Sequence, residues 1–402
     1  MTTGQLVMLV YTAALVLPGL FCLWRLPRCG PAAGGRAAVH RPPRRRVSVV
    51  IPALNEERRL GPLLASLGRQ TRRADELIVV DDGSTDGTAA LARRLGARVM
   101  RAPAKPAGWV GKSWACWTGA RSSSGGVLVF LDADVRQADD GLERLLAERD
   151  RRGGVVTVQP YHAVEGVVER LSAVCNIVVM GSLGAFTPLG GRAPTAGGFG
   201  PCIVAARRDY LACGGHAAVH DRVAEDMAFA DAARGKALPV ACLAGRGCVD
   251  FRMYPEGFSS MVEGWSKGLA SGFRGSPPLA RALMIAWLTG ALSGAILLAL
   301  GIATLGGSAG ADTLFGAWAV GIYALYAGQA WWMLRRMGSF GPATALVFPL
   351  PLAFFLAVYA RSLWLAKVRG SVTWKGRRVS VTPRARASSP TRSRRPRSSP
   401  RA

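Results

Sequence analysis

Four segments without a charged residue constrain this chain of 402 residues more than any other feature. Each has about the 20 residues that a helix needs to cross the apolar core of a membrane, about 30 Å thick. They cover residues 5–24, 282–310, 313–334 and 340–360. The first has no basic stretch before it and ends at Trp24 and Arg25, not at a small-residue cleavage site. It therefore predicts an uncleaved anchor over 1–24 in place of a secretory signal peptide, and the others predict transmembrane segments within 282–366.

The positive charge of the chain is concentrated beside these segments. The net charge is +26, and residues 25–46 and 361–402 hold seven and thirteen basic residues, with no acid in either. Basic segments beside membrane helices attract anionic headgroups and stay on the cytoplasmic side. We therefore expect a basic linker over 25–46 and no nucleic-acid partner. The stretch 367–402, rich in arginine, serine and proline, predicts a basic and partly disordered tail.

Between the linker and residue 250, short apolar runs alternate with amphipathic stretches. The apolar runs predict strands over 47–53, 76–82, 97–102 and 127–131. The stretches between them predict helices over 55–70, 84–96 and 111–124. Such alternation is typical of a parallel sheet with helices on both faces. We therefore expect an α/β domain over 47–250 whose ligands bind beyond the carboxyl ends of the strands.

Acidic residues stand at the carboxyl ends of two predicted strands. Asp81 and Asp82 end the second strand, and Asp132 and Asp134 follow the apolar run 127–131. Two carboxylates so close together repel each other, and a divalent cation shared with a diphosphate removes that repulsion. The D-x-D pair therefore indicates a Mg²⁺ or Mn²⁺ site, against the alternative of a turn with an Asp cap. The first strand is followed by no G-x-G-x-x-G turn, which argues against a dinucleotide-binding fold.

Five motifs in order connect the chain with a known family. They are VVIPALNEE, ELIVVDDGSTDGT, GKSWA, LVFLDADV and the AED of residues 224–226. With this set the chain resembles glycosyltransferase family 2. The motifs VQPYH, FRMYPEGF, EGWSKGLASG and VTWKGRRVS extend the resemblance, over about 47–380, to a membrane-bound subgroup associated with carotenoid and hopanoid glycosylation. The resemblance implies a Rossmann-like GT-A fold. It also implies inverting transfer of one hexose from a nucleotide-diphospho-sugar, such as UDP-glucose, to a carotenoid, a carotenoid acid or a hopanoid.

The same resemblance implies a role for individual residues. The nucleotide base and ribose are expected to contact Pro52, Ala53, Glu56 and Asp82. Lys112 is expected near the nucleotide or its phosphates, Asp132 on the ribose and the metal, and Asp134 on the metal. The structural alternatives are a capping role at residue 82 and a solvated helix start at residue 112. Trp265 stands where processive relatives carry Q-x-x-R-W, without the Gln and Arg. This predicts single-sugar transfer, with Trp265 on the acceptor side or at the membrane interface.

Glu225 and Asp226 are the candidates for the catalytic base. A single displacement needs one base and no covalent nucleophile, because only the acceptor hydroxyl has to lose a proton. The resemblance assigns the base to Asp226, but the second position of this pair varies in the subgroup, so Glu225 stays in play. A carboxylic-acid acceptor is already ionised near neutral pH, so an Asp at 226 favours an alcohol acceptor. His162, His216 and His220 are either contacts for acceptor or phosphate or, as we favour, loop residues satisfied by backbone.

The remaining expectations concern a multi-pass protein of the cell membrane. Residues 251–281 form an aromatic, amphipathic stretch that predicts an interfacial region. Pro349 and Pro351 divide the last apolar segment into halves too short to span, so we expect it to be re-entrant or interfacial, with the tail and the catalytic domain cytoplasmic. Residues 374–377 are assigned to donor phosphates or to lipid headgroups. Two alternatives stay open: transfer to a polyprenyl phosphate or a ceramide-like lipid, and a catalytically inactive membrane scaffold.

Overall fold

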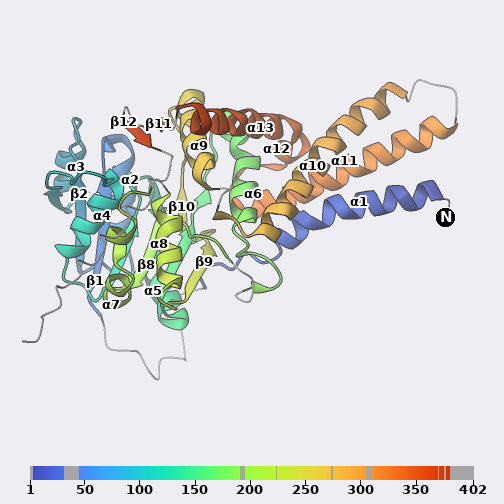
Figure 1. Ribbon diagram of the computed structural model, residues 1–402. Helices are drawn as coiled ribbons and strands as arrows, with labels where there is room; N and C mark the ends of the chain where they lie inside the picture. The colour runs from blue at the N-terminus through green and yellow to red at the C-terminus, as the bar shows by residue number, and fades with distance from the viewer. Residues whose placement is uncertain are drawn as a thin grey trace, which may run out of the picture.

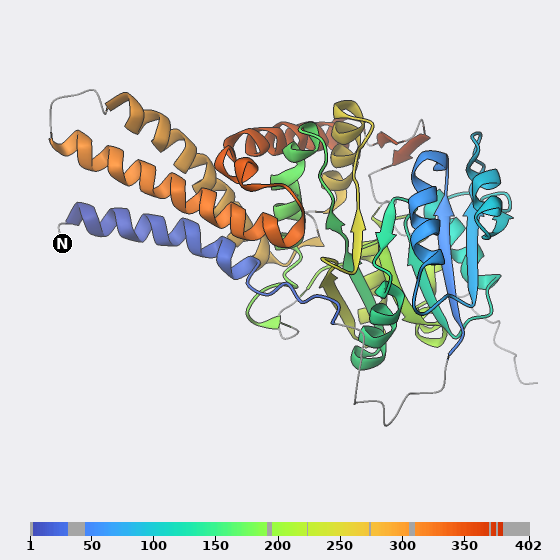
Figure 2. The ribbon, with the colours of Figure 1, turned by 180° about the vertical axis from the view of Figure 1, so that it is seen from behind.

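The chain folds into an α/β domain and a bundle of long helices that projects from one side of it (Figures 1 and 2). The structure is a computed structural model that describes residues 3–30, 45–190, 195–222, 224–272, 275–304, 310–369, 371–374 and 377–380. The bundle consists of α1 (Thr3–Cys22), α10 (Pro278–Thr304) and α11 (Gly310–Met337). Helices from both ends of the sequence therefore lie side by side, outside the α/β domain.

A mixed sheet forms the centre of the α/β domain, with the strand order β3-β2-β1-β4-β8-β6-β9. The strands are β1 (Val47–Ala53), β2 (Glu76–Asp81), β3 (Arg98–Arg101), β4 (Val127–Leu131), β6 (Val155–Gln159), β8 (Cys202–Ala206) and β9 (Val240–Ala244). The first four strands are parallel, as the sequence predicts. β8 is antiparallel to both β4 and β6, so the expectation of a parallel sheet is wrong there. The reason is the long excursion between β6 and β8, which returns the chain beside the carboxyl end of β4.

Alternate residues of the strands face two separate cores. Val49 and Ile51 pack toward the side of α2 (Glu57–Gly68) and α5 (Gly141–Arg152). Val50 packs toward the opposite side, which is covered by α4 (Gly111–Arg121) and α8 (Glu225–Arg234). Because successive side chains of a strand point to opposite faces, a strand covered on both sides has to be apolar throughout. The remaining helices of this part are α3 (Thr88–Arg94), α7 (Arg207–Ala212) and the 3₁₀ turn η4 (Gly215–Val219).

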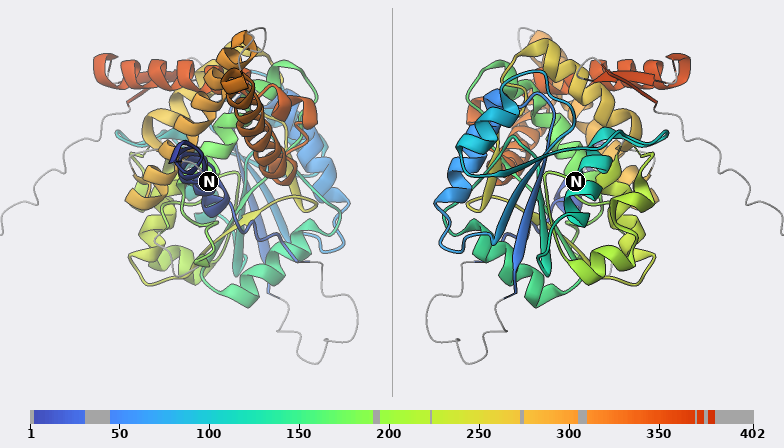
Figure 3. Two further views of the ribbon diagram at one scale, coloured as in Figure 1. Left: turned by 90° about the vertical axis from the view of Figure 1, so that its right-hand side faces the viewer. Right: turned by 90° about the vertical axis from the view of Figure 1, so that its left-hand side faces the viewer.

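A second, smaller sheet stands beside the end of β4. Its order is β5-β10-β7, with β5 (Val135–Gln137), β10 (Val249–Phe251) and β7 (Tyr161–His162). The chain then continues into helices that lie between the sheets and the bundle: η2 (Val168–Ser172), α6 (Ala173–Ser182) and α9 (Phe258–Gly272). These helices cover the side of the domain toward which the carboxyl ends of β1 and β4 point (Figure 3).

Polar contacts fasten α1 to the hairpin of α10 and α11. Tyr326 Oη donates to the carbonyl of Leu15 at 2.7 Å, and Gln329 Nε2 donates to the carbonyl of Val16 at 2.8 Å. Gln329 Oε1 accepts a hydrogen bond from Trp287 Nε1 at 2.7 Å. Burying a polar group among apolar helices costs free energy unless the group is hydrogen-bonded. These bonds therefore satisfy the polar groups and fix the register of the three helices.

Within the described residues, two helical stretches are long and apolar enough to cross a membrane, Pro278–Ile302 and Pro349–Val368. α1 contributes a shorter apolar stretch, Val10–Cys22. The second long stretch contains α13 (Pro349–Trp364) and the π-helical η6 (Leu365–Arg369), and α12 (Pro342–Leu346) precedes it. The sequence predicted that Pro349 and Pro351 divide the last apolar segment into two parts, each too short to span a membrane. This prediction is wrong for the part that begins at Pro349. Both prolines lie in the first turn of α13, where no intrahelical N–H bond is lost, so they begin a helix and do not divide one.

α13 does not join the projecting bundle. It crosses the top of the α/β domain, whereas α10 and α11 point away from the domain (Figure 3). It packs against α9, where Ser362 Oγ donates to the carbonyl of Ser266 at 2.8 Å. The predicted interfacial region 251–281 thus contains α9, and α13 lies against that helix.

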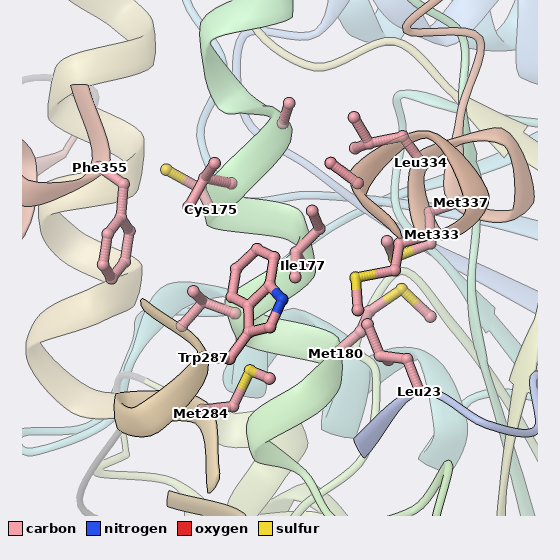
Figure 4. Close-up of a cluster of buried hydrophobic side chains, with 14 of the residues drawn as sticks. Leu23, Cys175, Ile177, Met180, Met284, Trp287, Met333, Leu334, Met337 and Phe355 are labelled. Carbon is pink, nitrogen blue, oxygen red and sulfur yellow. The ribbon is translucent and has the colours of Figure 1, made fainter. Parts of the chain in front are cut away.

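A large apolar cluster joins the bundle to the domain. Met284 and Trp287 of α10 lie against α6, with Ile177 and Met180 of that helix beside them and Met333 of α11 nearby (Figure 4). All five side chains are almost completely buried. α6 is therefore shared between the two parts, which makes the bundle a packed extension of the domain.

The first residues of the predicted basic linker belong to the α/β domain. The N–H of Ala244 donates to the carbonyl of Pro27 at 2.7 Å, and Arg28 forms a parallel bridge with Ala244, beside the edge strand β9. Arg144 of α5 donates to the carbonyls of Cys29 and Gly30, at 2.7 Å each. Residues 25–30 therefore form a strap along the sheet edge, and residues 31–44 of the predicted linker lie outside the described residues.

Candidate active site

Lys112 joins two of the predicted site residues. It is the second residue of α4, and Asp132 follows directly after β4. Lys112 Nζ lies 2.8 Å from Asp132 Oδ1, 3.0 Å from Asp132 Oδ2 and 2.9 Å from Glu225 Oε1. Burial disfavours the charge of Lys112, but Asp132 and Glu225 outweigh it and hold the pKa of Lys112 well above its usual value. Lys112 is thus an ion-paired member of the site and not a solvated helix start.

Asp226 is held in place at the start of α8 by backbone donors. The N–H of Gly200 donates to Asp226 Oδ2 at 2.9 Å, and the N–H of Met227 donates to Asp226 Oδ1 at 2.9 Å. A Cβ atom at residue 200 would lie 2.9 Å from Asp226 Cβ, so glycine is needed for this approach. The antiparallel direction of β8 supplies the contact, because it brings residues 198–201 beside Asp132, whose N–H donates to the carbonyl of Pro201 at 3.0 Å.

The two neighbouring carboxyls of α8 have different acidities. Burial, and then the charge of Glu225, raises the pKa of Asp226 to about 6. Burial also opposes ionisation of Glu225, but Lys112 and Lys267 outweigh it and hold the pKa of Glu225 below its usual value. A general base works best when its pKa lies near the working pH. Asp226 therefore has the properties of a base, whereas the charge of Glu225 is engaged by lysines.

Asp134 lies in the loop between β4 and β5. Burial, and then the charge of Asp132, raises the pKa of Asp134 to about 7, and Arg59 opposes this rise. A carboxylate with such a raised pKa is stabilised in its charged form by a nearby cation. Within the described residues, no group of three or more His, Cys, Asp or Glu side chains could hold a metal ion. The two carboxylates of Asp132 and Asp134 are oxygen ligands of the kind that Mg²⁺ and Mn²⁺ prefer, so their chemistry fits such an ion.

The predicted nucleotide contacts lie together at the ends of β1 and β2. Ala53 pairs with Asp81 across the parallel strands, with Pro52 beside it, and the N–H of Asp82 donates to the carbonyl of Ala53 at 2.9 Å. The N–H of Glu56, just before α2, donates to Thr88 Oγ1 at 2.8 Å. The ends of two strands and the start of α2 therefore bring these four residues to one edge of the sheet.

The sequence did not single out Arg59, which connects this edge with the turn just before α9. Arg59 Nε donates to Glu256 at 2.9 Å, and its Nη1 lies 3.9 Å from Glu56 Oε2. Its charge also acts on Asp134. A single arginine on the polar side of a surface helix carries no signal in the sequence, because its hydrogen-bond partner Glu256 lies nearly 200 residues away.

A cavity of about 300 Å³ opens at the end of β4, and it has a polar end and an apolar wall. The polar end contains Lys112, Asp132, Glu225, Asp226 and Lys267. The wall is supplied by α6, α8, α9 and the loops beside them and includes Val179, Leu183, Phe199, Met227, Met253, Trp265 and Leu269. Five of the predicted site residues therefore line one cavity, Trp265 among them. The other five lie on the neighbouring edge without lining it: Pro52, Ala53, Glu56, Asp82 and Asp134.

The three described histidines, His162, His216 and His220, do not line this cavity. His216 is buried with its Nδ1 3.0 Å from Tyr210 Oη, and burial lowers the pKa of His216 to about 4. His162 is buried beside Asn176, at 3.3 Å, and burial lowers the pKa of His162 to about 4. His220 Nδ1 lies 3.0 Å from the carbonyl of Ala217. The prediction of loop histidines satisfied by backbone holds for the ring of His220 and is wrong for the rings of His162 and His216, whose partners are side chains.

The predicted contact region 374–377 is only partly described. β11 (Ser371–Trp374) and β12 (Arg377–Ser380) form an antiparallel hairpin, and Lys375 and Gly376 lie outside the described residues. The assignment of this region to phosphates or headgroups stays a prediction.

The fold and the site together define a glycosyltransferase with a GT-A domain. A family model described as "Glycosyl transferase family 2" matches residues 48–213. The chain is 34% identical over 340 residues to the 4,4'-diaponeurosporenoate glycosyltransferase of Staphylococcus aureus (strain MRSA252), across 84% of this chain and 88% of the relative. The protein from strain USA300 matches at the same identity and coverage. The chain belongs to glycosyltransferase family 2.

Solved structures give weaker likenesses. One is the mannosyltransferase PcManGT from Pyrobaculum calidifontis in complex with GDP-Man and Mn²⁺, at 20% identity and a TM-score of 0.49, covering 90% of this chain and 99% of that one. Another is the glucosyl-3-phosphoglycerate synthase from Mycobacterium tuberculosis with Mg²⁺ and UDP, at 24% identity and a TM-score of 0.38, covering 56% and 77%.

Proposed function

We propose that this glycosyltransferase inverts the anomeric centre and moves one hexose, with UDP-glucose as the first donor to test, to a membrane lipid of the carotenoid or hopanoid kind. The observation that carries the proposal is the two-sided cavity. A nucleotide-sugar is soluble in water and a lipid acceptor is not, so an enzyme that joins them needs a polar and an apolar surface at one point. The similarity to a diaponeurosporenoate glycosyltransferase supports a carotenoid-like acceptor.

Asp226 is the base in this proposal. An acceptor hydroxyl attacks the anomeric carbon while its proton passes to Asp226, and the bond to the diphosphate breaks on the opposite face, which inverts the configuration. A well-placed base contributes about 10²–10⁴ in rate. The two backbone N–H groups at 2.9 Å orient the Asp226 carboxylate for this task. Lys112, at the same end of the cavity, offers positive charge to the departing nucleoside diphosphate.

The donor lies, in this proposal, along the edge formed by the ends of β1, β2 and β4. Asp132 and Asp134 would hold a Mg²⁺ or Mn²⁺ ion against the diphosphate, and such an ion offsets the charge that develops on the leaving group. Asp132 also contacts the ribose. The base and ribose are contacted by Pro52, Ala53, Glu56 and Asp82, and Trp265 faces the acceptor.

The protein acts at the cell membrane as a multi-pass protein, with its catalytic domain on the cytoplasmic side. The two long apolar stretches support membrane association. The arginines of residues 25–46 directly follow α1, and basic residues beside a membrane helix favour the cytoplasmic side.

Membranes that contain the protein, incubated with radiolabelled UDP-glucose and then with other labelled nucleotide-sugars, test the proposal. We expect label in the lipid extract with the wild type and not with Asp226→Asn, if the acceptor is an alcohol, or with Asp134→Asn for any acceptor. A labelled product that releases phosphate on hydrolysis would point instead to a polyprenyl phosphate acceptor. Label that stays in the aqueous phase with every donor, without hydrolysis of the nucleotide-sugar, would identify an inactive scaffold.

A further inference from the structure

A second hollow, a groove between α10 and α13, lies where α10 leaves the α/β domain. It has a volume of about 490 Å³ and shares no lining residue with the active-site cavity. α10 supplies one wall, with Arg281, Ile285, Leu288 and Leu292, and α13 supplies the other, which includes Phe355 and Tyr359. The groove is therefore a separate space, and its volume is within the range of ligand pockets, about 300–1,000 Å³.

The four wall residues of α10 follow one face of that helix. They are four, three and four residues apart, which places them in one row along the helix axis. On the neighbouring face, Met284 and Trp287 are buried in the apolar cluster that joins the bundle to the domain. Ile285 and Leu292 are instead exposed, and no segment that the structure describes covers them. The row is therefore apolar surface that is open to a ligand.

Arg281 gives this groove a positive end. Among the described residues it is the only charged one that lines the groove, and its half-buried side chain makes no ion pair or hydrogen bond with them. A guanidinium group keeps its charge at any physiological pH, and its N–H groups match the oxygens of a phosphate in pairs. The groove therefore offers an anion site next to an apolar wall.

The place of Arg281 along α10 corresponds to that of a lipid headgroup. It is in the first turn of α10, beside the domain, and Leu292 lies eleven residues farther toward the tip of the bundle (Figure 1). At 1.5 Å per residue the row is about 16 Å long. The hydrocarbon of one leaflet is about 15 Å deep, half of an apolar core of about 30 Å. A phospholipid with its phosphate at Arg281 would therefore lay an acyl chain along the row, in the direction that chains take in a bilayer.

We propose that the groove binds one anionic phospholipid, with its phosphate on Arg281 and an acyl chain against Ile285, Leu288 and Leu292. A zwitterionic phospholipid also brings a cation, for which the described groove residues offer no carboxylate. The bound lipid contacts both walls and so ties α13 to α10. The inference goes beyond the proposed reaction and shares with it only the location at a membrane.

Native mass spectrometry of the purified full-length protein, released from detergent micelles, counts the lipids bound to each chain and tests the inference. The probes are dioleoyl phosphatidylglycerol, dioleoyl phosphatidylcholine and glycerophosphoglycerol, which is the anionic headgroup without its chains. The variants are Arg281→Met, which removes the charge, Arg281→Lys, which keeps it, and Leu292→Trp, which narrows the groove at an exposed position. Arg335→Met is the matched control, because it removes an exposed arginine from the last turn of α11, outside the groove.

We expect the wild type to bind one phosphatidylglycerol at least about tenfold more tightly than phosphatidylcholine, since hydrogen bonds between charged groups are worth that much. Arg281→Met should reduce this preference to less than about threefold. Arg281→Lys should keep part of it, because a point charge replaces the paired donors. Leu292→Trp should weaken both lipids, and Arg335→Met should change either affinity by less than about twofold.

Thermal unfolding gives a second readout. A ligand that binds only the folded state raises the melting temperature, so phosphatidylglycerol should stabilise the wild type and Arg335→Met more than it stabilises Arg281→Met. The melting temperature without lipid shows whether each variant folds. If Arg281→Met does not fold, Arg281→Lys and Leu292→Trp carry the test, and the inference then fails if both bind phosphatidylglycerol as the wild type does.

Equal affinity of the wild type for the two phospholipids overturns the inference. So does an equal loss of preference in Arg335→Met and Arg281→Met, which would identify a general attraction to basic surface. Glycerophosphoglycerol bound as tightly as the whole lipid would identify an anion site without a groove for a chain. Displacement of the phospholipid by 4,4′-diaponeurosporenoic acid would assign the groove to the acceptor, and a dimer that excludes lipid would assign it to a second copy. Transfer of label to lipid is a separate measurement, so either proposal can fail alone.

Discussion

Replacing Lys112 with methionine tests the centre of the site, because one ammonium group compensates two carboxylates there. Met has a similar length and no charge, so Lys112→Met leaves Asp132 and Glu225 without their cation at 2.8–3.0 Å. The Glu225 side chain has an exposed fraction of only 9%, while those of Lys112 and Asp132 are 32% and 27%. The penalty therefore comes mainly from Glu225.

The size of the penalty lies between two known limits. Breaking a buried ion pair from one side costs about 3–5 kcal/mol, and an exposed pair is worth about 0–1 kcal/mol. Because Lys112 is about one-third exposed, we expect a loss of about 2 kcal/mol near neutral pH. For a domain of this size the loss corresponds to a fall of about 4–8 °C in the melting temperature.

The penalty should depend on pH in a predictable direction. In the wild type the folded pKa of Glu225 is lowered, so its stabilising contribution is present above the unfolded pKa and is lost only as the pH falls through the folded value. In Lys112→Met, burial, which is already the largest single influence on the pKa of Glu225, is opposed mainly by Lys267, and we expect the folded pKa of Glu225 to rise above the unfolded value. Glu225 then destabilises the folded state at high pH and ceases to do so as it binds a proton. The difference between variant and wild type should therefore shrink from about pH 8 to about pH 5.5.

Thermal unfolding of detergent-solubilised protein at the two pH values measures this effect, with Lys236→Met, at an exposed position of the turn after α8, as a control that should not change the melting temperature. The affinity for UDP-glucose, measured in parallel, should fall in Lys112→Met alone. A melting temperature equal to that of the wild type, or a difference that is the same at both pH values, would show that Lys112 does not compensate Glu225.

Three further predictions address the metal, the base and the topology. Asp134→Asn should abolish transfer without loss of folding or membrane insertion, and EDTA should do the same reversibly; full activity in excess chelator would contradict a metal role. With an alcohol acceptor, Asp226→Asn should lower kcat by about 10²–10⁴ and Glu225→Gln far less, whereas with a carboxylic-acid acceptor Asp226→Asn should cost less than about tenfold because no proton is removed. A dead Glu225→Gln beside a nearly active Asp226→Asn would reassign the base. A C-terminal tag should resist protease added to intact cells, and its cleavage would place the tail outside.

The strands and the acidic positions could be predicted because their causes are local. The run Val127–Leu131 lies between two hydrophobic cores and therefore has to be apolar. Asp132 directly follows this run in the sequence, so its position at the carboxyl end of a strand could be predicted. The helix start at Lys112 and the acidic start of α8 at Glu225 are likewise visible in short windows.

The parts that could not be predicted depend on distant segments. The antiparallel β8 is decided by the route of the chain after β6, and only that route brings Gly200 against Asp226. The apolar helix α6 shows no amphipathic period, because nearly all of its residues are buried between the domain and the bundle. Lys267 is a single lysine in an apolar stretch. Its charge lowers the pKa of Glu225, which lies on another helix, so this effect could not be predicted from the sequence.

The strap of residues 25–30 limits which fragments of the enzyme can be expressed as folded protein. A fragment that begins at Val47, designed to give a soluble catalytic domain, loses the backbone that covers the edge of β9 at Ala244. It also loses the carbonyls of Leu15 and Val16 that accept from Tyr326 and Gln329. An uncovered strand edge is a template for pairing with other chains, so we expect such a fragment to aggregate. Material for crystals or kinetics therefore has to keep α1.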